Sequence, residues 1–497
     1  MKQNPRLMMA VLAALILLAP ATGGVTAQGA PAGEPGGSNV ILGFIRGVGG
    51  GATEYCNSGV TTSDGSFIIG GYSLTYHPGG LGDILMAKFD GQGTLTWAKT
   101  YGGSYNEQFF DLWENNDGTL FGAGYMYLGA ASSTIDFLVA KFAADGTPIW
   151  SYTGGGASAS DVAYAGQGTA DGGYIVIGYT TGYVDPAGDI LLVRLTSTGS
   201  VLWARSLTAQ VGPGFDGGYC LCQASSGAFY IGGYTESLGN TSQGLIARMT
   251  PDGNLSWCKT FGGSAAEGVN QIVATPDGGF VAAGFIGSQG QGNNDIFVFR
   301  GTSQGSVVWS RLFGGPDNDY ATGIDTTPDG GWIISASTRS CGDIDGDGLL
   351  IKLDSNGNFQ WSSKAGGNNA DFVRGVDSLS NGYFLYGQQS SFSAGFEDIL
   401  MVRTNSSGMV PGCSQVSTCD LVESLPIWNF TNTAMVLWVL TDQFTWTSRT
   451  PTTSSPTIAT QLVCAYDPPA VPAMNTFGAV ALALFLGAAL WFAARRF

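Results

Sequence analysis

The chain has 497 residues and carries 20 basic against 37 acidic side chains, which gives a formal net charge of −17. A surface this acidic repels the phosphate backbone of nucleic acids, so we expect no nucleic-acid partner. Glycine is abundant at 78 residues, aromatic residues make up 12% and charged residues only 11%, which argues against a disordered chain and favours short strands joined by glycine turns.

The first 27 residues read as a secretory signal peptide. Lys2 and Arg6 precede an apolar run over 7–19, and small residues end at Ala27, where we expect cleavage. The apolar run is short for a membrane span, and an uncleaved N-terminal anchor is the alternative. We therefore expect an exported protein that is located at the cell surface or secreted.

Residues 39–409 consist of repeats that each contain four short strands. A turn of the Asp-Gly type followed by a β-rich run begins at Asp64, Asp117, Asp171, Ser226, Asp277, Asp329 and Asn381. A second marker, a tryptophan at 97, 150, 203, 257, 309 and 361, keeps step with these turns in six of the seven repeats. Repeats of this length with four strands each predict a β-propeller.

The last repeat lacks its outer strand, and the beginning of the chain supplies a match for it. Phe44-Ile-Arg46 aligns with Trp97-Ala-Lys99 of the first full repeat. The sequence therefore predicts an all-β, seven-bladed propeller that an N-terminal strand closes, leaving no open edge. We expect the aromatic residues of the outer strands to dock each blade on the next, and they are Phe44, Trp97, Trp150, Trp203, Trp257, Trp309 and Trp361.

Acidic residues open the first and the third strand of the repeats, and the propeller topology places both sets on one face. The first set is Glu54, Glu107, Asp161, Asp216, Glu267, Asp319 and Asp371. The second set is Asp83, Asp136, Asp189, Asp295, Asp347 and Asp398. Either the two sets form an acidic face that binds cations, or each carboxylate accepts backbone N–H bonds and fixes its loop. The sevenfold repetition favours the second interpretation.

One segment has the spacing of a calcium-binding loop. Asp343, Asp345 and Asp347 alternate and are followed by Gly348, so three carboxylates on a tight turn can converge on one hard cation. Asp354 at position twelve falls on the following strand, unlike the ligand of an EF-hand. Ca²⁺ is therefore the candidate cofactor, and a solvated acidic loop is the alternative.

Residues 410–470 form a cysteine-containing, β-rich region that either packs on the propeller or forms a stalk. Alternation over Pro426–Trp446 predicts a hairpin, and 450–457 reads as a spacer. Cys464 can pair with Cys413 or with Cys419, and the sequence leaves this choice open. The apolar run 477–494, followed by two arginines, predicts a transmembrane helix, which makes the membrane a partner.

Two resemblances extend these predictions. The repeat, seen in Asp171–Tyr174, Asp189–Leu191 and Trp203, resembles a family of repeat propellers in exported bacterial and archaeal proteins, most of which have surface or structural roles. The tail 471–497 resembles the IPTL-type C-terminal sorting signal, with Thr476-Phe477 where that signal has Glu-Trp. This resemblance implies a tail that is cut and replaced by an anchor, and a plain membrane anchor is the alternative.

Catalytic chemistry has little support in the sequence. His77 is the only histidine and lies in a Pro-Gly loop, so no Ser/His/Asp set can be built. We expect a non-enzymatic, adhesion-like binding or structural module with a glycan or protein partner and no catalytic residue. The alternative is an extracellular carbohydrate-active enzyme, a lyase or glycosidase, which needs one repeat with extra polar residues on the acidic face. The sixth repeat comes closest, with Asp343 and Asp345.

Overall fold

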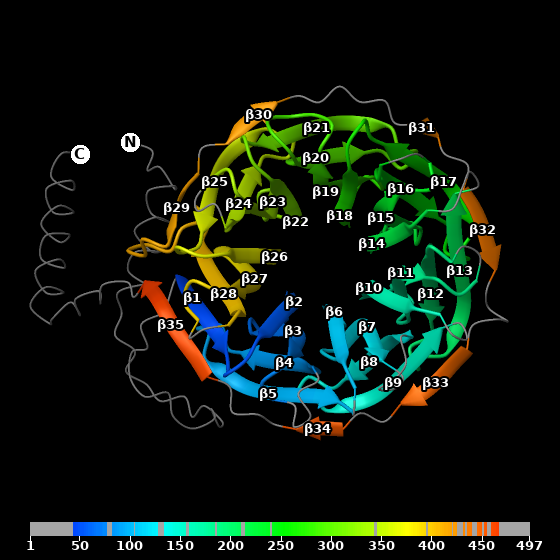
Figure 1. Ribbon diagram of the computed structural model, residues 1–497, viewed down its shortest axis with the longest axis horizontal. Coiled ribbons are helices and arrows are strands. Elements are labelled where there is room, and N and C mark those ends of the chain that lie inside the picture. The colour runs from blue at the N-terminus through cyan, green and yellow to red at the C-terminus, as the bar shows by residue number, and fades with distance from the viewer. Residues whose placement is uncertain are drawn as a thin grey trace, which may run out of the picture. The chain divides into compact units, whose positions relative to one another are not determined.

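The computed structural model describes residues 43–466, apart from short gaps at 77–81, 104, 128–133, 156–158, 184–185, 210–213, 239–240, 342–344, 394–395, 420, 425–430, 433–434, 440–444, 450–451 and 455–458. Every regular element within these residues is a β-strand. Seven five-stranded sheets surround a central axis, and four strands of each sheet form a propeller blade (Figure 1). The predicted all-β, seven-bladed propeller is confirmed.

The blades follow one another along the chain, and in each blade the first strand lies nearest the axis (Figure 1). Blades 1 to 3 contain β2 (Glu54–Thr61), β3 (Phe67–Ser73), β4 (Asp83–Phe89) and β5 (Leu95–Gly102); β6 (Glu107–Glu114), β7 (Leu120–Tyr127), β8 (Ile135–Phe142) and β9 (Pro148–Gly155); and β10 (Asp161–Gly168), β11 (Tyr174–Thr180), β12 (Asp189–Leu195) and β13 (Val201–Ala209). Blades 4 and 5 contain β14 (Asp216–Gln223), β15 (Phe229–Thr235), β16 (Gln243–Met249) and β17 (Leu255–Phe261); and β18 (Glu267–Ala274), β19 (Phe280–Ile286), β20 (Asp295–Gly301) and β21 (Val307–Gly314). Blades 6 and 7 contain β22 (Asp319–Thr326), β23 (Trp332–Thr338), β24 (Asp347–Leu353) and β25 (Phe359–Ala365); and β26 (Asp371–Leu379), β27 (Gly382–Gln389), β28 (Asp398–Asn405) and β1 (Gly43–Gly49).

The N-terminal strand β1 closes the ring. It pairs antiparallel with β28, with Phe44 opposite Arg403 and Val48 opposite Ile399. The last blade is therefore built from both ends of the propeller sequence, and its third strand has no exposed edge. This confirms the predicted closure.

Each blade begins with a hairpin whose turn contains a glycine, preceded by Asp in five blades, by Ser226 in blade 4 and by Asn381 in blade 7. In blade 1, Gly65 has a φ of +78°, a conformation that glycine adopts without strain. Asp64 lies beside it and accepts the Ser66 N–H at 3.0 Å, while Lys88 of the third strand places its Nζ 2.8 Å from Asp64 Oδ2. Equivalent ion pairs join Lys141 to Asp117, Arg194 to Asp171, Arg300 to Asp277 and Lys352 to Asp329.

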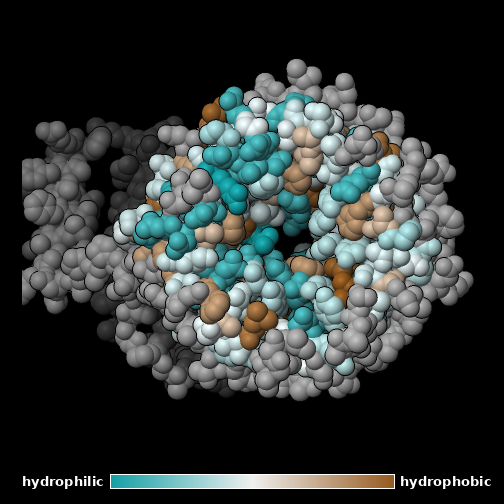
Figure 2. Space-filling model, viewed as in Figure 1, coloured by the Kyte–Doolittle hydropathy of each residue, from teal (hydrophilic) through white to brown (hydrophobic). Residues whose placement is uncertain are grey.

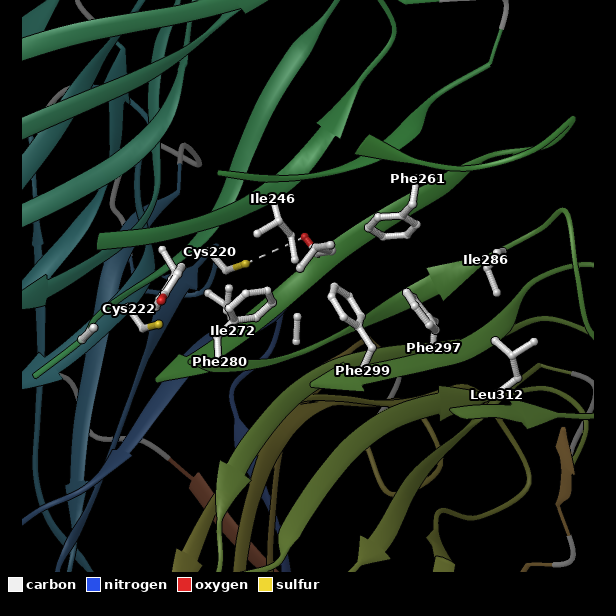
Figure 3. Packing of buried hydrophobic residues seen from close by; sticks show 14 residues of the cluster. Cys220, Cys222, Ile246, Phe261, Ile272, Phe280, Ile286, Phe297, Phe299 and Leu312 are labelled. Carbon is white, nitrogen blue, oxygen red and sulfur yellow. Dashed lines mark hydrogen bonds between the residues drawn. The ribbon is translucent and has the colours of Figure 1, made fainter. Parts of the chain in front are cut away.

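The core lies between blades, because the apolar side chains of second and third strands are buried on both sheet faces. Between blades 4 and 5, the rings of Phe280, Phe297 and Phe299 pack together (Figure 3), and the last two are stacked with centroids 4.8 Å apart. The Cys220 thiol of one first strand reaches the Val269 carbonyl of the next at 3.9 Å (Figure 3). Seven such clusters therefore join neighbouring blades around the ring.

The aromatic residue of each outer strand lies under a turn of the following blade. A Cβ atom on Gly93 of blade 1 would lie 2.7 Å from the Phe44 ring of blade 7. The indole N–H of Trp257 donates to the Ser303 carbonyl of the next blade at 3.0 Å. The same arrangement places Trp97, Trp150, Trp203, Trp309 and Trp361 against Gly146, Gly199, Gly253, Gly357 and Gly408.

A C-terminal segment, which we call the belt, runs around the outside of the ring and adds a fifth strand to every blade (Figure 1). It passes the blades in reverse order, from blade 6 down to blade 1 and then to blade 7. Its strands are β29 (Val416–Thr418), β30 (Val422–Ser424), β31 (Thr431–Asn432), β32 (Met435–Val439), β33 (Thr445–Arg449), β34 (Thr452–Ser454) and β35 (Ala459–Tyr466).

The hairpin predicted over Pro426–Trp446 is wrong. Its two halves pair with different blades, β32 with β13 of blade 3 and β33 with β9 of blade 2. The physical reason is that every outer strand presents a row of unpaired N–H and C=O groups, which an alternating segment satisfies as well as a hairpin partner does. The sequence left two arrangements open for this region, packing on the propeller or a stalk. Its described strands pack on the propeller.

Two disulfides fasten the belt. Cys413 pairs with Cys464, which settles the choice that the sequence left open, and so the belt is closed on itself. Cys341 pairs with Cys419 and ties the start of the belt to blade 6, a bridge that we did not expect. Among the described residues, no helix is long and apolar enough to cross a membrane. The predicted signal peptide and the apolar run 477–494 lie outside the described residues.

Candidate binding site at the junction of blades 7 and 1

The acidic residues that open the first strands are buried and fasten the glycine loops before them. Gly50 N–H donates to Glu54 Oε2 at 2.6 Å, and Gly315 N–H donates to Asp319 Oδ2 at 3.0 Å. Gly103, Gly263 and Gly367 donate in the same way to Glu107, Glu267 and Asp371. All seven carboxylates of the set are at most 4% exposed. In five of the seven, the carboxylate therefore uses hydrogen-bonding capacity to fasten a loop of the protein itself.

Acids of neighbouring blades converge in pairs. Asp398 and Glu54 both approach Gly49, and Asp295 and Asp319 both approach Gly314. Burial, reinforced by the neighbouring carboxylate, raises the pKa of Asp295 to about 7 and that of Asp398 to about 6. Burial beside another acid favours the protonated form of Asp295 and of Asp398.

Glu107 shows this effect most strongly. Its pKa is raised to about 8, chiefly by burial, with the Asp83 charge adding to it. In blade 1 the equivalent Glu54 accepts a hydroxyl hydrogen bond from Ser73 at 2.7 Å, whereas in blade 2 Met126 occupies the position of Ser73 and has no donor. Glu107 therefore lacks a hydrogen bond that would stabilise its charged form.

The predicted calcium loop is described only in part. Asp345 is exposed, Asp343 lies outside the described residues, and Asp347 is buried with its Oδ2 2.7 Å from Lys364 Nζ. No group of three or more potential metal ligands occurs among the residues that the structure covers, which do not include Asp343. The calcium site stays a prediction. The position of His77 lies in another gap in the description.

The channel along the axis has an aromatic side and a polar side. Tyr164 stacks on Tyr219 with ring centroids 4.6 Å apart, and Phe110 lies 5.1 Å from Tyr164, so three consecutive first strands share one row of rings. Arg374 and Asp377 line, together with residues from the first strands of blades 2 to 6, a hollow of about 360 Å³. Figure 2 shows one face hollowed at its centre, with hydrophilic and hydrophobic residues both around the opening.

A larger open cavity of about 620 Å³ lies where blade 7 meets blade 1. Its lining is Thr53, Tyr55, Asn369, Ser390, Ser393, Phe396 and Glu397. Four of these belong to the connection between β27 and β28, and Tyr55 belongs to β2. The Glu54 N–H donates to the Glu397 carbonyl at 2.9 Å and holds the two blades together at this point.

The cavity contains a carboxylate beside a tyrosine. The neighbouring Glu397, together with burial, raises the pKa of Tyr55, and the nearby Arg374 guanidinium opposes this shift. Arg374 lies within electrostatic range of Glu397, and its Nε donates to Gln388 Oε1 at 3.1 Å. The result is a polar surface whose carboxylate, Glu397, can accept hydrogen bonds.

The residues of this cavity were missed in the sequence, although a signal for them exists. In other blades the position of Glu397 is held by Gly82, Gly188, Ser242, Asn294 or Gly346, each accepting the same inter-blade N–H bond. Glu397 therefore departs from the repeat. Arg374 also departs from it, because the equivalent positions of the other blades hold polar or aromatic residues. The sixth repeat was named as the one with such departures, but the described cavity lies at the seventh.

Comparison with known proteins supports the fold. A family model described as a beta-propeller domain of unknown function, DUF5122, matches residues 169–201, which fall in blade 3. No curated protein sequence matches the chain. The match covers part of one repeat, and it agrees with the repeat propeller expected from the sequence.

Solved structures show only distant likeness. A protein of unknown function from Bacteroides caccae is 11% identical, with 64% of this chain and 93% of that chain covered and a TM-score of 0.34. Sqt1 from Chaetomium thermophilum is 10% identical, with 74% and 99% covered and a TM-score of 0.42. A protein from Bacteroides uniformis, provisionally assigned as a 6-phosphogluconolactonase, is 15% identical, with 74% and 99% covered and a TM-score of 0.43. Likeness at this level carries no information about ligand or activity.

Proposed function

We propose that this chain is an exported propeller that acts at the cell surface as a non-enzymatic, adhesion-like binding module. The observation that carries the proposal is that the recurring polar residues and the non-repeating polar residues lie in different places. The carboxylates that recur in every blade are buried on backbone amides, whereas Glu397, Phe396 and Arg374 depart from the repeat and gather at one open cavity or beside it. Residues that break a repeat are free to serve a ligand, because the frame does not need them.

The location rests on the chain ends. A signal peptide over 1–27 and a tail over 471–497, either sorted and cut or retained as an anchor, place the propeller outside the cell membrane. Separating culture medium, envelope and cytoplasm for cells that produce the tagged protein tests this location. Protein found only in the cytoplasm refutes it.

Calcium is the proposed cofactor of the loop with Asp343, Asp345 and Asp347. Hard oxygen ligands at this spacing suit Ca²⁺, and binding to the folded state raises the melting temperature. Adding calcium should stabilise the wild-type protein but not an Asp343→Asn/Asp345→Asn variant. An equal response of both proteins removes the metal from the proposal.

A carbohydrate-active enzyme is the second candidate, because Asp398 next to Glu397 has a pKa of about 6 and such an acid can donate a proton. Binding of the purified protein to an array of glycans and extracellular-matrix proteins, followed by chromatography of every bound glycan after prolonged incubation, separates the two. The binding module retains its ligand intact. Cleaved products that disappear in a Glu397→Gln variant establish the enzyme instead.

A further inference from the structure

The junction of blades 7 and 1 carries an aromatic surface that faces solvent. Phe396 is 61% exposed, more than any other large apolar side chain of the described residues. No ring pair within the described part of the chain involves it, whereas the tyrosines of the channel have their faces covered by one another, as Tyr164 does by Tyr219 at 4.6 Å. Phe396 therefore offers a free ring face to a ligand with an apolar side.

Polar groups surround this ring at the edge of the cavity. The Glu397 carboxylate lines the cavity beside Tyr55, and its lone pairs can accept hydrogen bonds from donors on a ligand. Asn369, Ser390 and Ser393 add an amide and two hydroxyls to the lining. The Asn369 amide and the Ser393 hydroxyl each donate to the Ser390 carbonyl, at 3.5 and 3.3 Å, and their oxygens can accept hydrogen bonds from a ligand. An aromatic plane beside a carboxylate, an amide and hydroxyls is complementary to a pyranose ring, which has one C–H face and a rim of hydroxyl groups.

Charge narrows the class of ligand further. The chain carries a net charge of −17, and the charged residue that lines the cavity is the acid Glu397. The nearest cation, Arg374, is engaged with Gln388 at 3.1 Å. Phosphate, sulfate and uronate groups are therefore repelled. The cavity volume of about 620 Å³ accommodates one or two sugar units, since ligand sites of this kind span about 300–1,000 Å³.

We propose that the cavity at the junction of blades 7 and 1 binds a neutral pyranose unit of a glycan, with Phe396 as the stacking platform and Glu397 as the acceptor of the sugar hydroxyls. This inference rests on the proposed binding function and names its ligand class. A glycan chain entering an open cavity at the ring surface needs no rearrangement of the blades, because the lining groups already stand in place.

Calorimetric titration with neutral hexasaccharides tests the inference. The probes are the hexamers of glucose in α1,4 and β1,4 linkage, of β1,4-mannose, of β1,4-galactose and of N-acetylglucosamine, with a hyaluronan hexasaccharide and hexalysine as charged probes. At least one neutral hexamer should bind. Phe396→Ala and Glu397→Gln should each weaken its Kd by about tenfold or more, because stacking and charge-assisted hydrogen bonds each contribute on that order.

Matched controls keep the outcome decisive. Phe359→Ala removes another exposed phenylalanine, on β25, and Glu236→Gln removes an exposed carboxylate in the corresponding connection of blade 4. Both controls should bind like the wild type, and all four variants should keep its melting temperature because the altered side chains are at the surface.

Three results overturn the inference, and they differ in what they say of the proposed function. Sugar binding that Phe396→Ala and Glu397→Gln leave unchanged places the sugar elsewhere and leaves the binding function standing. Binding of hexalysine alone, lost in Glu397→Gln, assigns the cavity to a cationic ligand. Binding of no hexamer, together with no ligand on the glycan and protein array, refutes both proposals.

Discussion

The disulfide that closes the belt should stabilise the whole propeller. Cys413 and Cys464 are separated by 51 residues, and the chain-entropy model assigns a loop of that length about 4 kcal/mol at 25 °C. Unfolding the body from Gly43 to Tyr466 has an entropy of about 0.9 kcal/mol/K at about 2.1 cal/mol/K per residue, so the Tm of a Cys413→Ser/Cys464→Ser variant should fall by about 4–5 °C. The variant should also release the end of the belt, because β35 then loses its covalent tie.

Scanning calorimetry and trypsin together measure both effects. Arg449 is the only basic residue between Arg403 and Arg495, and it lies in β33, so tryptic cleavage there reports on the belt alone. Cleavage should be slow in the wild type and faster in the variant. A Cys341→Ser/Cys419→Ser variant is the control, since it loses a loop of similar length but keeps the belt closed. If the first variant melts and is cut like the wild type, strand pairing alone holds the belt and the reasoning is wrong.

Three further predictions concern the frame. The pKa values of Glu107, Asp295 and Asp398 are raised to about 8, 7 and 6, so the folded state keeps protons that the unfolded state releases. The melting temperature should therefore be highest near pH 5 and fall towards pH 8, less steeply in Glu107→Gln. A melting temperature that stays constant from pH 5 to 8 contradicts the buried pairs. Trp203→Ala should lower the free energy of unfolding by about 3–5 kcal/mol in denaturant titration, because the indole is 8% exposed and its N–H bonds to the next blade, and a loss below 1 kcal/mol would show that docking is dispensable. Gly178→Ala should lower the free energy of unfolding by about 1–3 kcal/mol by the same measurement, because its Cβ would collide with the Val162 carbonyl. Gly51→Ala, which has open space around it, should leave this free energy unchanged. Equal effects of the two substitutions would refute the close approach at Gly178.

The ring itself could be predicted from sequence because its information is local and repeated. Seven turns of the Asp-Gly type each fix one hairpin, and six tryptophans with Phe44 in the seventh place each mark one outer strand, so the two markers agree on seven blades. Phe44-Ile-Arg46 could be matched to Trp97-Ala-Lys99 because an edge must be closed and only one segment fits the pattern. The physical rules that act over a few residues were sufficient here.

The belt could not be predicted in the same way. Its strands are short, such as Thr431–Asn432, and each pairs with a blade edge that is hundreds of residues away in some cases. Such pairing depends on where the chain travels after blade 7, which no local turn specifies. The cysteines gave the one usable hint, and the Cys413–Cys464 choice still required the path of the belt.

The candidate site was missed for a related reason. The residues that recur in the repeats are the conspicuous candidates in the sequence, and they are buried in the frame, as Asp319 and Asp371 are. Glu397 and Arg374 stand out only when their repeat positions are compared with Gly82, Gly346 and Asn270, and their proximity depends on the contact between the last blade and the first. In a repeat protein the informative residues for function are those that fail to repeat.

The closed belt also determines how the molecule bears mechanical load. Force applied to the chain beyond Tyr466 reaches the Cys413–Cys464 disulfide within a few residues, and this bond transmits the force to the end of blade 7. The strands from β29 to β34 lie within the loop that the disulfide closes, so they bear none of this force. A tether at the C-terminal end would therefore pull on the seam where β1 joins β28, and the weak edge pairings around the circumference would be spared from being unzipped one after another.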